Sequence, residues 1–365
     1  MRDHIARWAA VAAAVVAVSA GCVEKPTPPA DRSSKPPVLS GDYLGRTPPG
    51  AAPELFAPGL VSTGLYERDV AMTPDGNELY FGLIDGGYVA IAVLKRLGGA
   101  WSGPEIAPFC DNPEVFDLEP HIVPDGQRFL FLSTRPREGQ ELKKGWANQD
   151  IWAMDRTPEG WSAPYNLGAP VNTDAPEFFP SVTRGGTLYF TREIEQDGKR
   201  RNLILRARPA QTSEPGGAGG PRPGPGGPSY AEPEILPAAV NPGDQQFNAF
   251  VDPEERYLIV CIAGREDNIG ACDYYVAFRD SNDVWTGPIN MGAAVNTPGN
   301  TVGSPYVSPD GRYFFFASNR RSDAAPPARE RTYRSIQEMA ARPQNGNSDI
   351  YWMDASFIEH LRRER

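Results

Sequence analysis

Histidine is scarce in this 365-residue chain, and its scarcity excludes two common kinds of active site. Of the three histidines, His4 lies near the N-terminus and His360 near the C-terminus, which leaves His121 in the expected folded part. One histidine cannot build a His-rich zinc site, and no Gly-x-Ser-x-Gly elbow is present to complete a Ser-His-Asp triad. We therefore expect a packed or channel-lining His121, and neither a metal nor a cofactor.

Long apolar runs and basic stripes are also missing. The uncharged apolar run of residues 8–18 is shorter than the roughly 20 residues that cross a bilayer. Lysine and arginine are scattered in a chain of net charge −10, so the clustered cations that contact phosphates are lacking and nucleic acid is not an expected partner. Helical periodicity is confined to residues 330–341, which favours β structure.

The N-terminus has the pattern of an export signal. Arg2 and Arg7 precede the apolar run, and Val-Ser-Ala-Gly-Cys follows it at residues 18–22. The small residues are typical of a lipobox, in which the Cys22 thiol takes a diacylglycerol and the chain gains acyl groups such as palmitate. The alternative is an ordinary secretory signal that ends near a cysteine.

A lipoprotein interpretation sets the expected location and the mature N-terminus. Residues 1–21 would be the signal peptide, and residues 22–52, rich in proline and poor in large apolar side chains, would be a disordered tether. Neither Val23 nor Glu24 resembles the aspartate that retains lipoproteins at the inner membrane. We expect anchoring through Cys22 in the outer membrane, facing the periplasm or the cell surface.

Internal self-similarity is the strongest pattern in the rest of the chain. Each copy reads as a short strand, a tight turn and a second strand with an alternating apolar face. The five copies are RDVAMTPDGNELYFGL from Arg68, LEPHIVPDGQRFLFLS from Leu118, FFPSVTRGGTLYFTRE from Phe178, FNAFVDPEERYLIVCI from Phe247 and GSPYVSPDGRYFFFAS from Gly303. In Pro-Asp-Gly, proline presets the first φ of the turn and glycine accepts a positive φ.

Further strands complete each unit. A third strand follows at residues 150–155 and 349–354, and a fourth begins at Trp101, Trp161 and Trp285. Four strands per unit are the content of a propeller blade. We expect an all-β fold: a single β-propeller of four-stranded antiparallel blades, with five blades, or six if one is hidden in the low-complexity stretch. The equivalent tryptophans are interpreted as packing residues rather than sugar platforms.

The N-terminal segment is expected to close the ring. The last unit ends in a helical pattern at residues 355–362, where its fourth strand should be, whereas Pro53–Pro58 matches residues 103–108. A strand exchanged from the N-terminus would complete the last blade and remove open sheet edges. The propeller domain would therefore span residues 53–365.

Two insertions interrupt the blades. Residues 209–228 form a glycine and proline loop without the Gly-Lys-Ser/Thr of a phosphate loop. Residues 321–347 contain a helical pattern, and this insertion is either a working face or lid, or tolerated decoration.

These motifs resemble TolB-type (WD-like, PD-repeat) β-propeller repeats over roughly residues 53–354. The pattern Trp-Ser-x-Pro-x-Asn-Leu-Gly-x-Pro-Val-Asn-Thr at residues 161–173, repeated with substitutions at 285–297, is similar to propellers of envelope lipoproteins. Residues 183–186 and 252–255 depart from the turn consensus. The resemblance implies a protein-binding or scaffold module of the envelope.

Alignment on the turn defines the candidate binding residues. Seven residues before the turn proline or its equivalent lie Glu67, Asp117, Glu177, Gln246 and Val302, and five residues before it lie Asp69, Glu119, Phe179, Asn248 and Ser304. Carboxylates from three successive blades would ring one side of the channel and could hold a cation, a basic peptide or a sugar. The predicted binding set is Glu67, Asp69, Asp117, Glu119, Glu177 and Asn248.

Two functions remain open at this point. In the first, the protein is a non-catalytic, monomeric lipoprotein that binds an envelope protein or glycan. In the second, it is a carbohydrate-active enzyme of glycoside-hydrolase type, with Asp69, Glu119 and Glu177 as candidate acids. The same acids recur with the repeat, whereas catalysis needs one special pair, so the first hypothesis is favoured.

The remaining cysteines suggest one possible crosslink. Cys261 and Cys272 flank a predicted hairpin and could pair in an oxidising envelope. Cys110 is then an odd thiol, expected to be buried.

Overall fold

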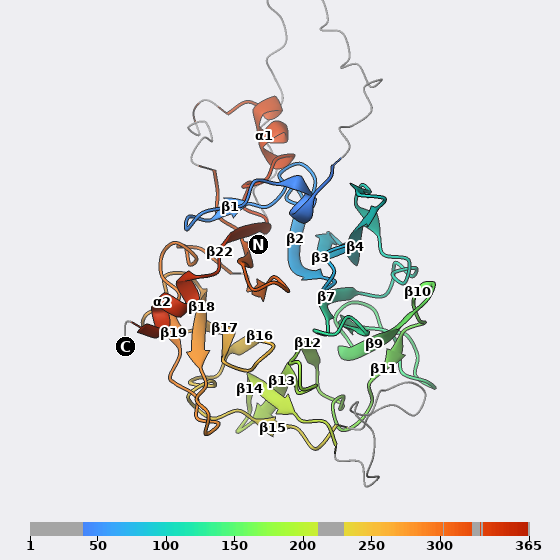
Figure 1. Cartoon of the computed structure of the whole chain (residues 1–365), viewed down its shortest axis with the longest axis vertical. Coiled ribbons are helices and arrows are strands. Elements are labelled where there is room, and N and C mark those ends of the chain that lie inside the picture. The colour runs from blue at the N-terminus through green and yellow to red at the C-terminus, as the bar shows by residue number, and fades with distance from the viewer. Residues whose placement is uncertain (1–38, 211–229, 302, 323–328, 330, 364–365) are drawn as a thin grey trace, which may run out of the picture. The chain divides into compact units, whose positions relative to one another are not determined.

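The chain folds into five β-sheets arranged around a common axis, a five-bladed β-propeller (Figure 1). The computed structural model describes residues 39–210, 230–301, 303–322, 329 and 331–363. The predicted all-β propeller with five blades is confirmed, and the six-blade alternative is wrong. The predicted signal peptide, Cys22, Val302 and most of the 209–228 insertion lie outside the described residues.

The strands follow the repeat. Blade 1 contains β2 (Tyr66–Met72), β3 (Glu78–Asp85), β4 (Tyr88–Leu97), β5 (Ala100–Trp101) and β6 (Glu105–Ile106). Blade 2 contains β7 (Asp117–Ile122), β8 (Arg128–Ser133), β9 (Asp150–Thr157), β10 (Gly160–Trp161) and β11 (Tyr165–Asn166). Blade 3 contains β12 (Glu177–Val182), β13 (Leu188–Gln196), β14 (Lys199–Ala207) and β15 (Glu234–Ile235). Blade 4 contains β16 (Gln246–Val251), β17 (Tyr257–Ala263), β18 (Cys272–Phe278) and β19 (Ile289–Asn290). Blade 5 contains β20 (Tyr306–Val307), β21 (Tyr313–Ser318), β22 (Asp349–Asp354) and β1 (Glu54–Leu55).

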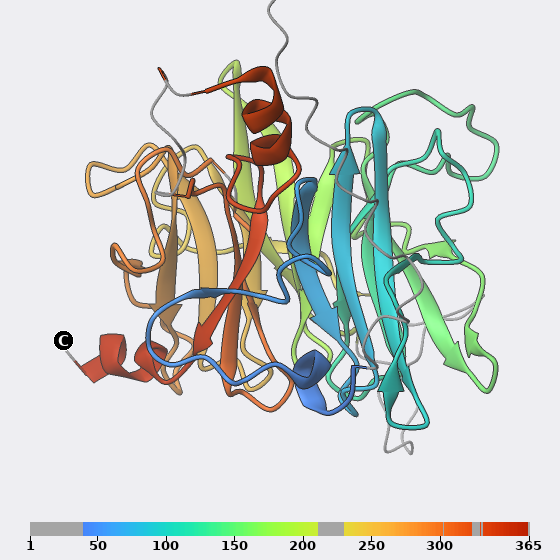
Figure 2. The ribbon, with the colours of Figure 1, turned by 90° about the horizontal axis from the view of Figure 1, so that it is seen from above.

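The propeller has two distinct faces (Figure 2). The turns between the first and second strands of the blades lie on one face, which we call the turn face. The opposite face, where the inner strands begin and the second and third strands are connected, is the loop face. Helix α1 (Tyr333–Ala340) belongs to the loop face, and helix α2 (Phe357–Arg363) to the turn face. None of the helices in the described part of the chain is long and apolar enough to cross a membrane.

The turns keep one geometry even where the sequence departs from Pro-Asp-Gly. In blade 1 the Gly76 N–H donates to the Thr73 carbonyl at 2.8 Å. In blade 4 the Glu255 N–H donates to the Asp252 carbonyl at 2.8 Å, with Glu255 at a φ of 55° in the position that glycine takes elsewhere. The neighbouring strands therefore hold the turn where its preferred residues are absent.

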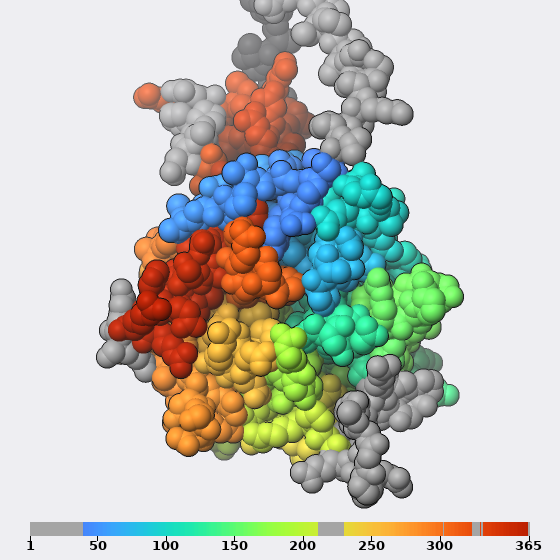
Figure 3. All heavy atoms as spheres, viewed as in Figure 1, coloured from blue at the N-terminus to red at the C-terminus, as the bar shows by residue number. Residues whose placement is uncertain are grey.

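The recurring tryptophans pack between blades. Trp161 Nε1 donates to the Tyr80 hydroxyl of the preceding blade at 2.8 Å. Trp285 makes an edge-to-face contact with Tyr189 of blade 3, with ring centroids 6.3 Å apart. Trp101 and Trp285 are buried, and Trp101 belongs to the same apolar cluster as residues of blade 5. The packing interpretation of these residues is confirmed, and the blades fill sectors around the centre (Figure 3).

The ring is closed by the N-terminal strand, as predicted. β1 pairs antiparallel with β22, with Leu55 opposite Tyr351, and the Phe56 N–H donates to the Ile350 carbonyl at 2.9 Å. The fully buried Phe56 ring lies 5.1 Å from the rings of both Phe315 and Trp352. Aromatic packing thus fixes the exchanged strand in blade 5.

The packed body begins earlier than the sequence indicates. The Leu39 and Gly41 carbonyls accept hydrogen bonds from Trp101 at 2.8 Å each, and Leu44 is buried. Residues 39–52 therefore belong to the folded body, and the expected tether of residues 22–52 is too long.

A polar latch, which the sequence did not reveal, closes each blade after its fourth strand. The Asn296 side chain accepts from the Tyr274 N–H at 2.8 Å and donates to the Tyr274 carbonyl at 3.1 Å. The latch thus gives a partner to the Tyr274 N–H of the third strand, and it shares the Tyr274 carbonyl with the Met291 N–H, which donates to it at 3.0 Å. The equivalent residues in blades 5, 1, 2 and 3 are Ser62, Cys110, Asn172 and Asn241.

The suggested disulfide is not present. Cys261 lies opposite Tyr274 and Cys272 opposite Ala263, so the two cysteines are offset by two positions in the β17–β18 ladder. Both are buried free thiols, as is Cys110. A diagonal offset of this kind separates Cβ atoms beyond the reach of a disulfide.

Candidate functional site

The predicted binding residues lie at two depths along the inner strands. Asp69, Glu119 and Asn248 lie near the propeller axis, and Glu67, Asp117 and Glu177 lie two residues earlier, towards the loop face. All six are buried. The partners of these side chains therefore decide whether the site is open to a ligand.

Each of the first four inner strands is kinked at the same place. Asp69, Glu119, Phe179 and Asn248 have φ values between 52° and 58°, and the strand register shifts beside each of them. Such a bulge removes backbone groups from the ladder. The Asp69 N–H instead donates to Ser304 Oγ at 2.8 Å, and the Phe179 N–H donates to Glu119 Oε2 at 2.7 Å. The kinked residues thus join neighbouring blades.

One arginine bridges the two central carboxylates. Arg68 Nε lies 2.7 Å from Asp69 Oδ2, and Arg68 Nη2 lies 3.1 Å from Glu119 Oε1. The Ser304 hydroxyl also donates to Asp69. Burial raises the pKa of Glu119 to about 8, and the nearby Arg68 opposes this rise. The acids at the axis are therefore already engaged by the protein.

The axial cavity is very small. It has a volume of about 10 Å³, which is about the space that one water needs. His121, which lines it, accepts a hydrogen bond at Nε2 from the Val182 N–H at 2.9 Å. Burial lowers the pKa of His121 to about 4, so the ring is neutral with its proton on Nδ1. As expected from the sequence, His121 is a packed residue, and it links blades 2 and 3.

The acids nearer the loop face are also paired. Asp117 forms an ion pair with Arg135, and Glu177 Oε1 lies 2.7 Å from Arg192 Nε. Burial raises the pKa of both carboxyls, while the arginines lower it. Arg192 lies within β13 and Arg135 just after β8, so these pairs connect the inner strand of a blade with its second strand or the residues that follow it.

Glu67 has no arginine of this kind. The Thr63 hydroxyl donates to its carboxylate, and burial, together with the charge of Asp349, raises the pKa of Glu67 to about 7. Burial also raises the pKa of Asp349 to about 7. A protonated carboxyl at either position would remove the repulsion between the two.

The structure therefore does not assemble the predicted acids into an open ring. Asp69 and Glu119 share one guanidinium in a nearly filled centre, whereas Glu177 is outside the lining of that cavity. No group of three or more His, Cys, Asp or Glu side chains in the described ranges could hold a metal ion.

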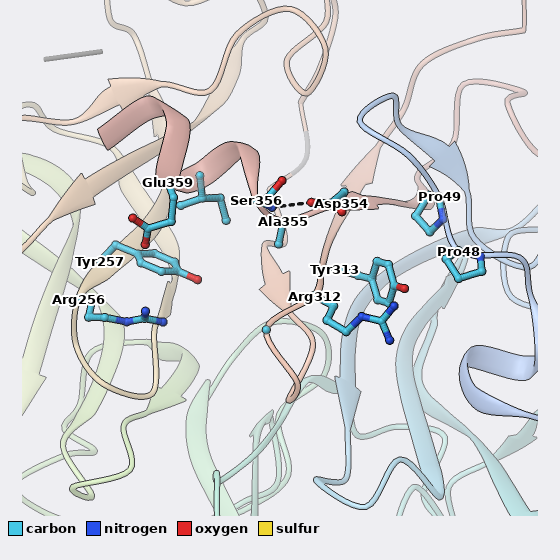
Figure 4. A pocket seen from close by; sticks show the side chains of 12 residues that line it. Pro48, Pro49, Arg256, Tyr257, Arg312, Tyr313, Asp354, Ala355, Ser356 and Glu359 are labelled. Atoms are coloured by element: carbon cyan, nitrogen blue, oxygen red, sulfur yellow. Dashed lines mark hydrogen bonds between the residues drawn. The ribbon is translucent and has the colours of Figure 1, made fainter. Parts of the chain in front are cut away.

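A larger cavity lies on the turn face between blades 4 and 5 (Figure 4). Its volume is about 450 Å³. Tyr257 and Tyr313 lie in its wall, each preceded by an arginine, and Glu359 of α2 lines it on the side of Tyr257. Sequence reasoning missed this site, although the Arg-Tyr pair after the turn occurs in both of these neighbouring repeats and is a detectable signal.

The loop face exposes large apolar side chains. Tyr333 and Ile336 of α1 are 78% and 51% exposed, and Trp146 in the β8–β9 connection is 47% exposed. Leu65 and Ile269 lie in other loops of this face and are also exposed. Aromatic side chains of this kind are enriched in protein interfaces.

The fold defines the class of the molecule as a five-bladed β-propeller. No protein-family model matches the sequence, and no curated protein matches it. Among solved structures, TolB from Acinetobacter baumannii is similar at 15% identity and a TM-score of 0.42, over 79% of this chain and 57% of that chain. A protein from Dyadobacter fermentans is similar at 13% identity and a TM-score of 0.42, over 74% of this chain and 80% of that chain. An α-L-arabinofuranosidase from Podospora anserina is similar at 10% identity and a TM-score of 0.42, over 83% of this chain and 93% of that chain.

Proposed function

We propose that this protein is a non-catalytic, monomeric binding module that is anchored to the cell envelope by lipid and engages a protein or glycan on one face of its propeller. The main support for this proposal is that the centre of the propeller is closed to a ligand. A substrate at Asp69 and Glu119 would have to displace Arg68 from both carboxylates, and the cavity there measures about 10 Å³. A glycoside hydrolase needs two carboxyl groups on either side of a bound sugar.

The loop face offers the surface for this partner. Exposed apolar and aromatic side chains cost little to desolvate and supply most of the binding energy in protein interfaces. Tyr333 and Ile336 lie one helical turn apart on α1, so one contact can cover both. The resemblance of the repeats to TolB-type envelope propellers supports a role of this kind.

The membrane anchor is supported by the sequence around Cys22. Mass spectrometry of the protein from membranes is expected to find a mature N-terminus at Cys22 that carries a diacylglycerol. Cys22→Ser should abolish the lipid and release the protein from the outer-membrane fraction. An unmodified Cys22 in purified membranes would contradict the anchor but not the binding module.

Photo-crosslinking tests the binding surface. A crosslinking amino acid at Tyr333 is expected to capture a discrete envelope partner in intact cells, whereas the same residue at Leu97, 74% exposed at a hairpin tip, should capture none. Ile336→Ser should reduce capture at least tenfold. Val284→Ser is the matched control, because Val284 is 59% exposed on the turn-face side. Equal capture with both variants would contradict the loop-face surface.

The enzyme alternative has its own test. Incubation with a panel of aryl glycosides should release no phenol above the level of the heat-denatured protein. Hydrolysis that is lost on Glu119→Gln substitution in a folded variant would replace the proposed function with the enzymatic one.

A further inference from the structure

The 450 Å³ cavity on the turn face has the size of a small-ligand site. It lies between the turns of blades 4 and 5 and is covered on one side by α2 (Figure 4). Its walls include the buried Tyr257, Tyr313 and Ile358, which are 6%, 3% and 2% exposed. The cavity therefore has apolar walls beneath a charged rim.

The repeat places two arginines at this rim. Arg256 and Arg312 occupy the same position after the turns of neighbouring blades, and each guanidinium lies over the ring of the tyrosine that follows it, at 6.0 Å and 5.1 Å from the centroid. Arg256 is held by Asp252, with Nη2 and Oδ1 2.8 Å apart. Its charge is therefore already balanced.

Arg312 differs from Arg256 in forming no ion pair within the described residues, although its charge helps to lower the pKa of Asp354. It is exposed, and among the described residues it forms no ion pair, although both Asp354 and Glu359 line the same cavity. Asp354 accepts the Ser356 N–H at 2.8 Å, and this hydrogen bond lowers its pKa. Within the described ranges Glu359 also forms no ion pair. Arg312 and Glu359 thus line one cavity without an ion pair to any described residue, although the charge of Glu359 acts on the nearby Arg256.

Two opposite charges that lack direct ion pairs, above buried tyrosine rings, match a ligand that carries both charges itself. A guanidinium recognises a carboxylate through two parallel N–H donors, and a carboxylate recognises an ammonium group as a compact charge. A simple anion would satisfy Arg312 but would be repelled by Glu359. A zwitterion satisfies both groups and leaves its own apolar part against Tyr257 and Tyr313.

We propose that this cavity binds a short peptide with free termini, its carboxylate at Arg312 and its ammonium group at Glu359. The site is separate from the loop-face surface and goes beyond the binding role proposed there. The ligand class is the amino-acid-type zwitterion, of which a dipeptide is the smallest peptide member.

The test uses calorimetric or NMR titration with four probes: Ala-Ala, N-acetyl-Ala-Ala, Ala-Ala amide and inorganic phosphate. Ala-Ala is expected to bind saturably, and both blocked peptides at least tenfold more weakly. Arg312→Gln should erase the difference between Ala-Ala and its amide. Glu359→Gln should erase the difference between Ala-Ala and its acetylated form. Arg334→Gln, an exposed arginine of α1, is the matched control and should leave all affinities unchanged.

Three results would overturn the proposal: no saturable binding of Ala-Ala, discrimination that survives both substitutions, or phosphate binding as strong as that of Ala-Ala. Circular dichroism checks that the variants are folded, and substitutions at exposed positions such as Arg312 rarely affect folding. The crosslinking experiment separates this site from the loop face. Arg312→Gln should retain capture at Tyr333, and Ile336→Ser should retain dipeptide binding.

Discussion

At the scale of single residues, polar side chains near the propeller axis accept hydrogen bonds from the backbone of the next blade. His121, Ser181 and Tyr306 occupy the same repeat position, three residues before the turn, and each accepts a backbone N–H of the following blade. The donors are Val182, Val251 and Met72, at 2.9, 3.0 and 3.1 Å. Because buried polar groups need partners, these hydrogen bonds between blades contribute to the stability of the ring.

Glu119 should make the stability of the protein fall as the pH rises. Its folded pKa of about 8 lies above the ordinary value of 4.5, so the folded state keeps a proton that the unfolded chain releases. This contribution is fully present below about pH 4.5 and is lost as the pH rises through about 8. Glu67 and Asp349 act in the same direction up to about pH 7.

Glu119→Gln isolates this effect. Glutamine keeps an acceptor for the Phe179 N–H but does not titrate, so the fall in Tm between pH 5 and pH 9 should be smaller than in the parent protein. Exposed Glu105→Gln is the control and should leave the pH dependence unchanged. Identical pH profiles for Glu119→Gln and the parent would contradict a raised pKa at this position.

At the scale of the element, the latch explains the Val-Asn-Thr ending of the repeat. Besides Tyr274, Asn296 contacts Asn290 in β19, with Asn296 Nδ2 2.9 Å from Asn290 Oδ1. Asn290 Nδ2 in turn donates to Asp273 at 2.9 Å. One asparagine therefore connects the third strand, the fourth strand and the connection that leads to the next blade.

Asn296→Ala should destabilise the protein more than an alanine substitution of an exposed polar residue does. It would leave the buried Tyr274 N–H without a partner, whereas the Tyr274 carbonyl keeps the Met291 N–H at 3.0 Å, so the expected cost is about 1 to 3 kcal/mol in the free energy of unfolding. Denaturant titration measures this loss. Asn282→Ala, in an exposed turn of the same blade, should change stability by less than about 0.5 kcal/mol. A similar effect of the two substitutions would refute the latch.

The repeat can be predicted from the sequence where turn residues and alternating apolar residues mark it. The five turn-centred copies therefore predict the blades and their number, and the match of residues 53–58 to residues 103–108 predicts the closure. The kink cannot be predicted in this way, because four residue types (Asp69, Glu119, Phe179 and Asn248) adopt it. The latch is also concealed, since serine, cysteine and asparagine all perform it. The acids at the axis align correctly, but their pairing with Arg68 depends on the neighbouring blade.

At the scale of the whole molecule, the ring is held shut by the first folded residues of the chain. β1 supplies the outer strand of blade 5, and Ser62 supplies its latch, bonded to Ile350, which is 288 residues away in sequence. The aromatic ring of Tyr43 adds an edge-to-face contact with Tyr313 at 4.9 Å. No covalent bond in the described residues joins the two ends, so the closure depends on packing and hydrogen bonds.

Phe56→Ala should therefore destabilise the pairing of β1 with blade 5 more than it destabilises the other blades. Loss of the fully buried ring is expected to cost about 3 to 5 kcal/mol, and hydrogen exchange should accelerate most at the Ile350 amide, which bonds to Ser62. Leu205→Ala in blade 3 is the matched control, because Leu205 is 1% exposed and its loss should reduce global stability without selective exchange at Ile350. If stability were distributed equally around the ring, both substitutions would change the exchange at Ile350 alike. Equal protection of the Ile350 amide from hydrogen exchange in the two variants would therefore show that the N-terminal strand is not the point at which the propeller opens.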